Sequence, residues 1–576
     1  NVMLNGFELN TANILYQSKN PIPNDNDEHV ELNSGGTVLQ WTSANDALSH
    51  NIYFGTDLAT VEAAGTTSAE YKGNQIKTNT SFPVSGLYTG ATYYWRVDEV
   101  LANNVIVKGN IWRFRPAQLA FPEAEGYGRF ARGGRGGKVV AVTNLNDSGP
   151  GSLREAVTND IGPRTIIFNT SGIIQLNSRL VLSQPYVTIA GQTAPGKGIC
   201  IRSAPFGITG NDAIVQNVRV RLGGGTTFDG MGLTGANHSI IDHCSISWTI
   251  DESFSSRSGK NITLQRTLIS EALNAAGHTN YPAGTQHGYA ATIGGDIGSF
   301  HHNLLAHNYG RNWSLGGGLD ANNFFGGRMD ITNNVVYNWG SRTTDGGTKE
   351  VNFVGNYYKP GPGTELKQYA LTMDHEDNFG GMQRAYFNGN VMPGFFDETS
   401  QELGRRSRLS NGITISYETF VNAPFFPSYV TTQSAANAYK IVLSDVGCTQ
   451  PELDNHDQRM IAETLGGTYS AVGSVTGKKG FPDNEADSGG YENYPVINRA
   501  ADWDSDNDGL PNWWETIKGT NVNSGSGDFS DANADANLDG YTNLDEYLQW
   551  MSLPHYESPT GNKVSVNIQK LSRGFT

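Results

Sequence analysis

The chain has 576 residues, of which 37% are hydrophobic and 17% are charged, and its formal net charge is −16. This length predicts about three or four domains with ample core, and the negative charge argues against nucleic acid as a partner. A composition poor in charges and rich in glycine favours a β-rich extracellular protein. No apolar run reaches about eighteen residues, so no membrane span is expected.

The start of the chain shows neither a basic n-region nor an apolar h-region. We therefore expect a secreted protein whose signal peptide is absent from the sequence shown. Three cysteines do not make a disulfide framework. Two of them, Cys200 and Cys244, lie in apolar strand-like runs and are expected to be buried thiols.

Residues 1–20 carry no clear pattern, whereas residues 21–116 show short alternating runs between turns, which predict strands. The run at 87–93, LYTGATY, precedes the strand-like run YYWRV. This arrangement resembles the tyrosine corner of a fibronectin type III sandwich. We predict a β-sandwich that acts as a spacer or a binding accessory and is not the catalyst.

A proline- and glycine-rich passage at 116–137 marks the start of a new domain, which we place at 117–500. Between about 138 and 400, a small polar residue recurs between two short β-runs, at positions 217, 244, 267, 303, 334, 356 and 390. Such a repeat predicts a solenoid of stacked coils, and the shortest spacings are too small for the four-stranded blades of a propeller. We expect Asn303, Asn334 and Asn356 to hydrogen-bond along the stack and satisfy buried amides.

Long sequence matches identify a family for this central region. The matches are GGRGG at 133–137, VTNLNDSGPGSLR at 142–154 and TIAGQTAPG at 188–196, followed by the shorter motifs Ile241-Asp242-His243, His301-His302-Asn303 and Arg311. From about Phe121 to about Pro362 the chain resembles the pectate lyases of polysaccharide lyase family 1, in the form common in Bacteroidetes-type bacteria. The resemblance implies an all-β protein whose catalytic domain is a right-handed parallel β-helix. It also implies cleavage of polygalacturonate by calcium-dependent β-elimination.

This chemistry explains why a solitary arginine can matter. β-Elimination removes a weakly acidic proton beside a carboxylate, and a bound cation that withdraws charge from the carboxylate stabilises the enolate-like transition state. An arginine can then accept the proton, although its guanidinium group normally stays protonated. The resemblance places this base at Arg311; the alternative is a surface arginine in an ordinary salt bridge.

The family's calcium ligands correspond to Asp229 and Asp251. A further acid normally follows Asp251 at the fourth position, where this chain has Ser255, and the adjacent Glu252 is the candidate to compensate. The alternative for Glu252 is an exposed charge at a strand edge. Asp242 and His243 match the family's Asp-His pair, which we interpret as scaffold hydrogen bonding.

The chain departs from the family at two substrate-binding positions. The family's lysine corresponds to Tyr289, and its second arginine corresponds to Gly316. We therefore expect other groups to contact uronate carboxylates, each with an ordinary surface role as the alternative; the candidates are His278, His287, Tyr289, Arg342, Arg219, Arg221 and Lys349. Trp313 either stacks on a sugar ring or packs under the loop.

Residues 501–576 form an acidic, asparagine-rich segment in which a calcium-binding pattern occurs twice. Both copies fit the twelve-residue EF-hand loop, with oxygen ligands at positions 1, 3, 5 and 12 and glycine at position 6. The copies consist of Asp504, Asp506, Asp508 and Glu515, and of Asp535, Asn537, Asp539 and Glu546. They resemble the dockerin-like and thrombospondin type 3-like modules of secreted bacterial polysaccharide enzymes. We predict structural Ca²⁺ here, because so short a segment has little core of its own.

Two other functions stay open. A polygalacturonase-type hydrolase on the same fold needs clustered carboxylates as acid and base, a role open to Asp229, Asp251 and Glu252, but its Asn-Thr-Asp and paired-Asp signatures are absent. A non-catalytic carbohydrate-binding adhesin predicts no turnover. For the lyase we expect a monomer that acts on acidic plant polysaccharide, with accessory domains that attach it to a cell surface or a scaffold.

Overall fold

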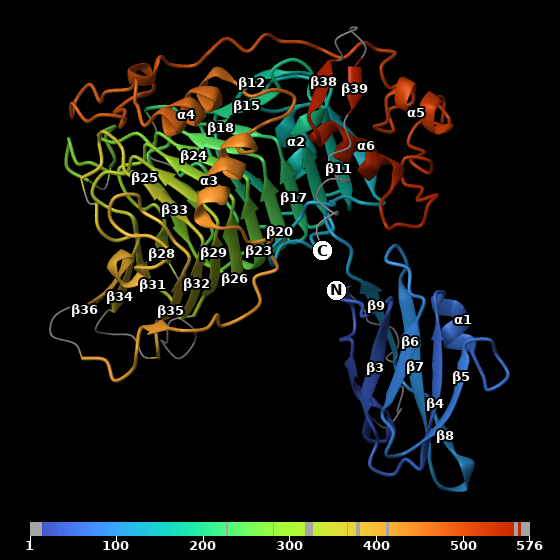
Figure 1. Cartoon of the computed structure of the whole chain (residues 1–576). Helices are drawn as coiled ribbons and strands as arrows, with labels where there is room; N and C mark the ends of the chain where they lie inside the picture. The colour runs from blue at the N-terminus through green and yellow to red at the C-terminus, as the bar shows by residue number, and fades with distance from the viewer. Residues whose placement is uncertain are drawn as a thin grey trace, which may run out of the picture. The chain divides into compact units, whose positions relative to one another are not determined.

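The computed structural model describes residues 14–557, except 226–228, 280, 317–325, 366, 376–380 and 410–413, together with residues 563–565. The chain divides into two compact units, Asn1–Gln118 with Asp535–Tyr541 and Leu119–Ala534 with Thr542–Thr576. In the described part, no helix is long and apolar enough to cross a membrane. The strands between Lys19 and Pro116, in the first unit, are coloured blue in Figure 1.

The N-terminal unit contains two mainly antiparallel sheets. One consists of β1 (Lys19–Ile22), β3 (Gly36–Thr42) and β6 (Ser81–Ser85); the other consists of β2 (Asp27–Val30), β9 (Ile111–Pro116), β7 (Tyr93–Val100), β4 (Ser49–Gly55) and β5 (Tyr71–Ile76), with β8 (Ile106–Val107) paired to β7. One short helix, α1 (Leu58–Ala63), follows β4. The core contains Leu39, Trp41, Trp95 and Trp112. The Tyr93 hydroxyl accepts a hydrogen bond from the backbone N–H of Tyr88 at 2.8 Å, the contact that a tyrosine corner requires.

The second unit is a parallel β-helix with three long sheets. The first sheet has eleven strands: β10 (Lys138–Val142), β11 (Arg164–Phe168), β14 (Val187–Ala190), β17 (Ala213–Gln216), β20 (Asn237–Asp242), β23 (Lys260–Gln265), β26 (Asp296–His301), β29 (Arg328–Thr332), β32 (Glu350–Val354), β35 (Arg384–Asn388) and β37 (Phe420–Val421). The second has eight: β12 (Gly172–Gln175), β15 (Ile199–Arg202), β18 (Arg219–Arg221), β21 (Ser245–Ser247), β24 (Leu268–Ser270), β27 (Leu304–Ala306), β30 (Val335–Tyr337) and β33 (Tyr357–Lys359).

The third sheet, which carries the predicted active site, has nine strands. They are β13 (Leu180–Leu182), β16 (Phe206–Ile208), β19 (Met231–Gly232), β22 (Asp251–Ser255), β25 (Gly288–Ile293), β28 (Ser314–Gly316), β31 (Thr344–Gly347), β34 (Leu371–His375) and β36 (Arg405–Leu409). Along the coils of the helix, the chain visits the three sheets in turn, so neighbouring strands of one sheet come from successive coils. The predicted solenoid is confirmed in this parallel pairing.

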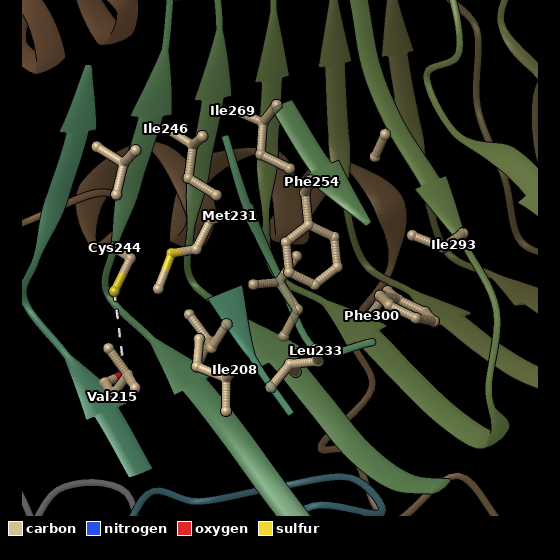
Figure 2. Packing of buried hydrophobic residues seen from close by; sticks show 14 of the residues in the cluster. Ile208, Val215, Met231, Leu233, Cys244, Ile246, Phe254, Ile269, Ile293 and Phe300 are labelled. Atoms are coloured by element: carbon tan, nitrogen blue, oxygen red, sulfur yellow. Dashed lines mark hydrogen bonds between the residues drawn. The ribbon is translucent and has the colours of Figure 1, made fainter. Parts of the chain in front are cut away.

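Apolar side chains of successive coils pack in layers inside the helix. Figure 2 shows Met231 of β19 and Phe254 of β22 among isoleucines of neighbouring coils, with Cys244 close to Val215. Cys200 and Cys244 are free and buried, as expected. Full burial of one such large side chain contributes about 1.5–3 kcal/mol, so a long stack provides a rigid frame for the groups outside it.

A ladder of asparagines follows one corner of the helix. Asn303 donates to the side-chain oxygen of Asn334, Asn334 to that of Asn356, and Asn356 to that of Asn390, each at 3.0 Å. All four are fully buried. The predicted structural role of Asn303, Asn334 and Asn356 is therefore confirmed.

Other segments cover the outer faces of two sheets. Helices α3 (Ala435–Ser444) and α4 (Asn455–Gly466) lie along the eight-stranded sheet (Figure 1) and share an apolar cluster with its strands. Residues 120–131 pack on the eleven-stranded sheet, where the backbone N–H of Gly128 donates to Thr263 Oγ1 at 2.9 Å. The expectation that Arg219 and Arg221 contact the substrate is wrong, because both side chains are buried. Arg221 pairs with Asp454, at the N-terminus of α4, at 2.5 Å.

Short helices complete the unit. They are α2 (Leu153–Thr158), α5 (Asn512–Lys518) and α6 (Asn543–Ser552), together with the 3-10 turns η3 (Gly191–Thr193), η4 (Gln401–Gly404) and η5 (Glu485–Ser488). The N-terminal unit has the 3-10 turns η1 (Ile14–Tyr16) and η2 (Ala102–Asn104). After α6, β38 (His555–Glu557) and β39 (Lys563–Ser565) pair in antiparallel fashion. The C-terminal segment packs on the first coils: Trp514, Leu544 and Tyr547 form one apolar cluster with Val139 and Ala190.

Candidate active site

Three carboxylates from two successive coils meet at the nine-stranded sheet. Asp229 is separated from the short strand β19 by Gly230 alone, and Asp251 and Glu252 begin β22, which pairs with β19 in parallel. One carboxylate oxygen from each lies within 4.8 Å of the other two. The structure therefore brings Asp229 of one coil together with the adjacent pair Asp251 and Glu252 of the next.

The surroundings of these acids disfavour so much negative charge. Burial, followed by repulsion from Glu252 and Asp251, raises the pKa of Asp229 to about 7, and Ser255 opposes the shift by donating to its carboxylate at 3.3 Å. Burial and the charge of Glu252 also raise the pKa of Asp251. Like charges held together in this way indicate a place that favours a cation.

The guanidinium group of Arg311 lies against this cluster. Its Nη1 atom donates a short hydrogen bond to Glu252 and lies 3.5 Å from Asp251 Oδ1. The Thr292 hydroxyl donates to the same Glu252 oxygen at 2.5 Å. On its other side, the Arg311 Cζ atom lies 4.1 Å from the ring centre of Tyr289. The predicted base and the predicted metal ligands therefore form one polar cluster.

Two of these residues adopt an uncommon backbone conformation. Asp251 has φ 80° and Arg311 has φ 54°, both in the left-handed region that non-glycine residues seldom adopt. Such strain persists only where the surrounding structure enforces it, and it clusters at functional sites. In Arg311 the stacked coils enforce it: the backbone carbonyl of Arg311 accepts from the N–H of Ala291 in β25 at 3.1 Å.

Three of the predicted substrate-binding groups lie around the cluster. Tyr289 stacks on Arg311, and its ring centre is 5.8 Å from the Arg342 Cζ atom. Arg342 is held by Asp345 at 2.6 Å. His278 Nε2 is 3.8 Å from Asp251 Oδ2.

Two other substrate-binding predictions require correction, because their side chains are buried. Trp313 is 0% exposed and packs against Phe300 inside the helix, with 5.7 Å between ring centres. His287 is 1% exposed, and its ring stacks on Tyr281 at 5.4 Å. Trp313 thus takes the packing alternative, and His287 supports Tyr281 and His278 from the interior.

The structure adds residues that the sequence did not indicate. Thr292 bridges Glu252 and Arg311, and Arg257 reaches Glu252 from the end of β22 at 3.3 Å. Neither belongs to a short motif; their only sequence signal is a position beside a predicted ligand or strand. A hollow beside Asp229 is lined by residues of β13, β16, β19 and β22 and of the segments next to these strands. They include Arg179, Phe206, Met231 and Ser255.

A second acidic cluster lies in the C-terminal segment. Asp504, Asp506 and Asp508 form one group of neighbouring carboxylates, and Asp508, Glu515 and Asp531 form another. Asp531 was missed because it lies outside the EF-hand pattern. Burial is the largest cause that raises the pKa of Asp504 to about 6, of Glu515 to about 7 and of Asp508 to about 8.

Each of the two predicted EF-hand loops contains the same kind of internal hydrogen bond. The backbone N–H of Gly509 donates to Asp504 at 3.0 Å, and that of Gly540 donates to Asp535 at 2.7 Å. In the second loop, Asn537 donates to Asp539 at 3.1 Å, while Glu546 pairs with Lys518. Calcium binding in both loops stays a prediction.

Several known proteins are similar to this chain. No family model matches the chain. Probable pectate lyase C of Aspergillus flavus is 33% identical over 447 residues, which cover 76% of this chain and 94% of that protein. Probable pectate lyase C of Emericella nidulans is 36% identical over 418 residues, which cover 71% and 89%. A solved structure described as a pectate lyase bound to hexasaccharide is 12% identical and covers 58% of this chain and 98% of its own, with a TM-score of 0.38.

The fold and the site define a class of protein: a parallel β-helix that carries clustered carboxylates and an arginine on one of its sheets. The relatives define the family within it. Because the chain is at least 33% identical to proteins whose length it covers almost completely, it belongs to the pectate lyase family. The prediction of an enzyme of this family is confirmed.

Proposed function

We propose that the protein cleaves polygalacturonate by calcium-dependent β-elimination, with Arg311 as the base. The observation that carries this proposal is the position of the Arg311 guanidinium against Asp251 and Glu252, whose carboxylates cluster with that of Asp229 from the adjacent coil. An arginine in an ordinary surface salt bridge has one acidic partner. Arg311 has two acidic partners and an aromatic ring beneath it.

The acidic residues fit a calcium ion. Asp229, Asp251 and Glu252 offer only carboxylate oxygens, the hard ligands that Ca²⁺ prefers. Burial, and then repulsion from Glu252 and Asp251, raises the pKa of Asp229, so a cation beside its carboxylate would favour the charged form. When bound, the ion would withdraw charge from the substrate carboxylate and so acidify the adjacent C–H proton.

The protein's own groups prepare the base. Glu252 accepts from Thr292, Arg257 and Arg311. If Glu252 turns toward a cation, Arg311 loses its shortest contact, and its Nη1 atom can face the substrate. The Tyr289 ring then holds the plane of the guanidinium group. Arg311, once it has released one proton to become a neutral guanidine, would accept the C–H proton at a nitrogen. The electron pair then forms the C=C bond as the bond to the glycosidic oxygen breaks, and that oxygen takes up a proton from solvent.

One assay tests this function against a hydrolase and an adhesin. The protein is incubated with polygalacturonate with and without calcium, and ultraviolet absorbance is followed together with reducing ends. We expect calcium-dependent absorbance from an unsaturated product. Reducing ends without absorbance would indicate a hydrolase, and neither signal would indicate a binding protein.

The accessory regions complete the proposal. We propose that the N-terminal sandwich is of the fibronectin type III kind, which the Tyr93–Tyr88 contact supports. We also propose that the C-terminal segment binds calcium as a structural element. A polymer of plant cell walls lies outside the cell, so the enzyme would work there as a secreted monomer.

A further inference from the structure

The site needs positive charge to hold a polyanion, and most of its cations are already occupied. Arg311 is engaged by two carboxylates, and Arg342 is held by two contacts to Asp345. Arg257 differs from both. Its side chain is 59% exposed, and its contact within the described site is a single nitrogen 3.3 Å from Glu252.

The path of the Arg257 side chain is the second observation. Arg257 follows β22, and its Cα atom lies 3.6 Å from the place where a Cβ atom of Gly294 would be. Its Nε atom lies 4.0 Å from the place of a Cβ atom on Gly316, at the end of β28. The side chain therefore crosses the coil of β25 and arrives above β28. Glycines at 294 and 316 leave this path open.

We propose that Arg257 binds a uronate carboxylate of the substrate beside the bond that is cleaved. It thereby supplies, from another coil, the cation that Gly316 cannot provide. A guanidinium group has five N–H donors in a planar fork that matches a carboxylate. The contact with Glu252 uses one nitrogen and holds the group next to the acid cluster, so the rest of the fork faces outward. This inference rests on the proposed function.

The test compares Arg257→Gln with the wild-type enzyme on two substrates. On polygalacturonate, we expect KM to rise about tenfold with a smaller change in kcat, because one charge-assisted hydrogen bond is lost. On partly methyl-esterified polygalacturonate, which keeps some free carboxylates for the calcium site, the difference in KM between the two enzymes should shrink, because an ester carries no charge for Arg257 to pair. Arg257→Lys should lie between them, since it keeps the charge and loses the fork.

Arg328→Gln is the matched control, since Arg328 is an exposed arginine of the eleven-stranded sheet that pairs with Asp296. It should leave both KM values unchanged. Equal KM for Arg257→Gln and wild type on polygalacturonate would overturn the inference. So would a variant that changes only the calcium concentration needed for activity, because Arg257 would then serve Glu252 alone. Wild-type protein without calcium-dependent absorbance would instead refute the proposed function.

Discussion

The molecule contains two clusters of acids that are built in opposite ways. At the nine-stranded sheet, Glu252 is 4% exposed and accepts hydrogen bonds from Thr292, Arg257 and Arg311. In the C-terminal segment, Glu515 is 0% exposed, and neither of its carboxylate oxygens has a hydrogen-bond partner in the described structure. Single oxygens of Asp504, Asp506 and Asp508 are also buried without partners.

This difference separates a cation that serves chemistry from one that serves folding. A buried charge without a partner is costly, so the C-terminal carboxylates need a cation or protons to be stable. The cluster at the active site has arginines that partly balance it. We therefore expect calcium to control activity at the first cluster and stability at the second.

The largest expected effect comes from the base. Arg311→Lys keeps the positive charge but removes the nitrogen that faces the substrate, so we expect kcat to fall by about 10³-fold, within the usual range for loss of a general base. Ultraviolet absorbance on polygalacturonate measures it, and circular dichroism checks the fold. Arg328→Lys serves as the control. A kcat within tenfold of wild type would show that Arg311 is not the base.

The next effect concerns stability in calcium. Calcium at about a hundred times its dissociation constant should stabilise the wild type by about 3 kcal/mol, measured as a rise in the thermal midpoint over a chelator. Asp508→Asn should lose much of this rise, because Asp508 belongs to both acidic groups. In chelator at neutral pH it should be at least as stable as wild type, since it removes a buried carboxyl group that must keep a proton in the folded state.

Asp229→Asn makes the corresponding change in the acidic cluster of the nine-stranded sheet. We expect it to abolish activity and to keep the thermal response to calcium. If Asp229→Asn lost the thermal response and Asp508→Asn kept it, the two roles would be reversed.

A third effect is a pH dependence of stability without calcium. The pKa of Glu515 is raised to about 7 and that of Asp508 to about 8, so the folded state holds protons that the unfolded state has released. Unfolding free energy should therefore fall as pH rises from about 4 to about 8. Thermal midpoints in chelator across this range measure it. Saturating calcium should remove most of the slope, and a flat profile in chelator would contradict the assignment.

The smallest effect should come from Thr292→Val. This change removes one donor to Glu252 and keeps the shape of the side chain, at a cost of about 1 kcal/mol in that interaction. We expect kcat/KM to fall about threefold to tenfold, with an unchanged thermal response to calcium. A changed thermal response would mean that the two clusters are coupled.

Local spacing explains what could be predicted for the site. The loop ligands Asp504, Asp506 and Asp508 lie on one short turn, so covalent geometry alone brings them together. The Tyr88–Tyr93 contact is local in the same way. Glu252 is different. The sequence made it only a candidate to replace the acid that the family has at position 255, and the three-dimensional arrangement shows that its carboxylate lies beside that of Asp229.

The sequence by itself determined the coil repeat, the asparagine ladder, the loop pattern and the family, because each is a property of residues at regular or short spacing. Only the tertiary structure decided which side chains meet across coils. It brought Arg257 over Gly316 and Asp531 to Glu515, and it buried Trp313. The physical reason is that loops of unequal length separate the strands, so the residues that become neighbours depend on how the coils stack.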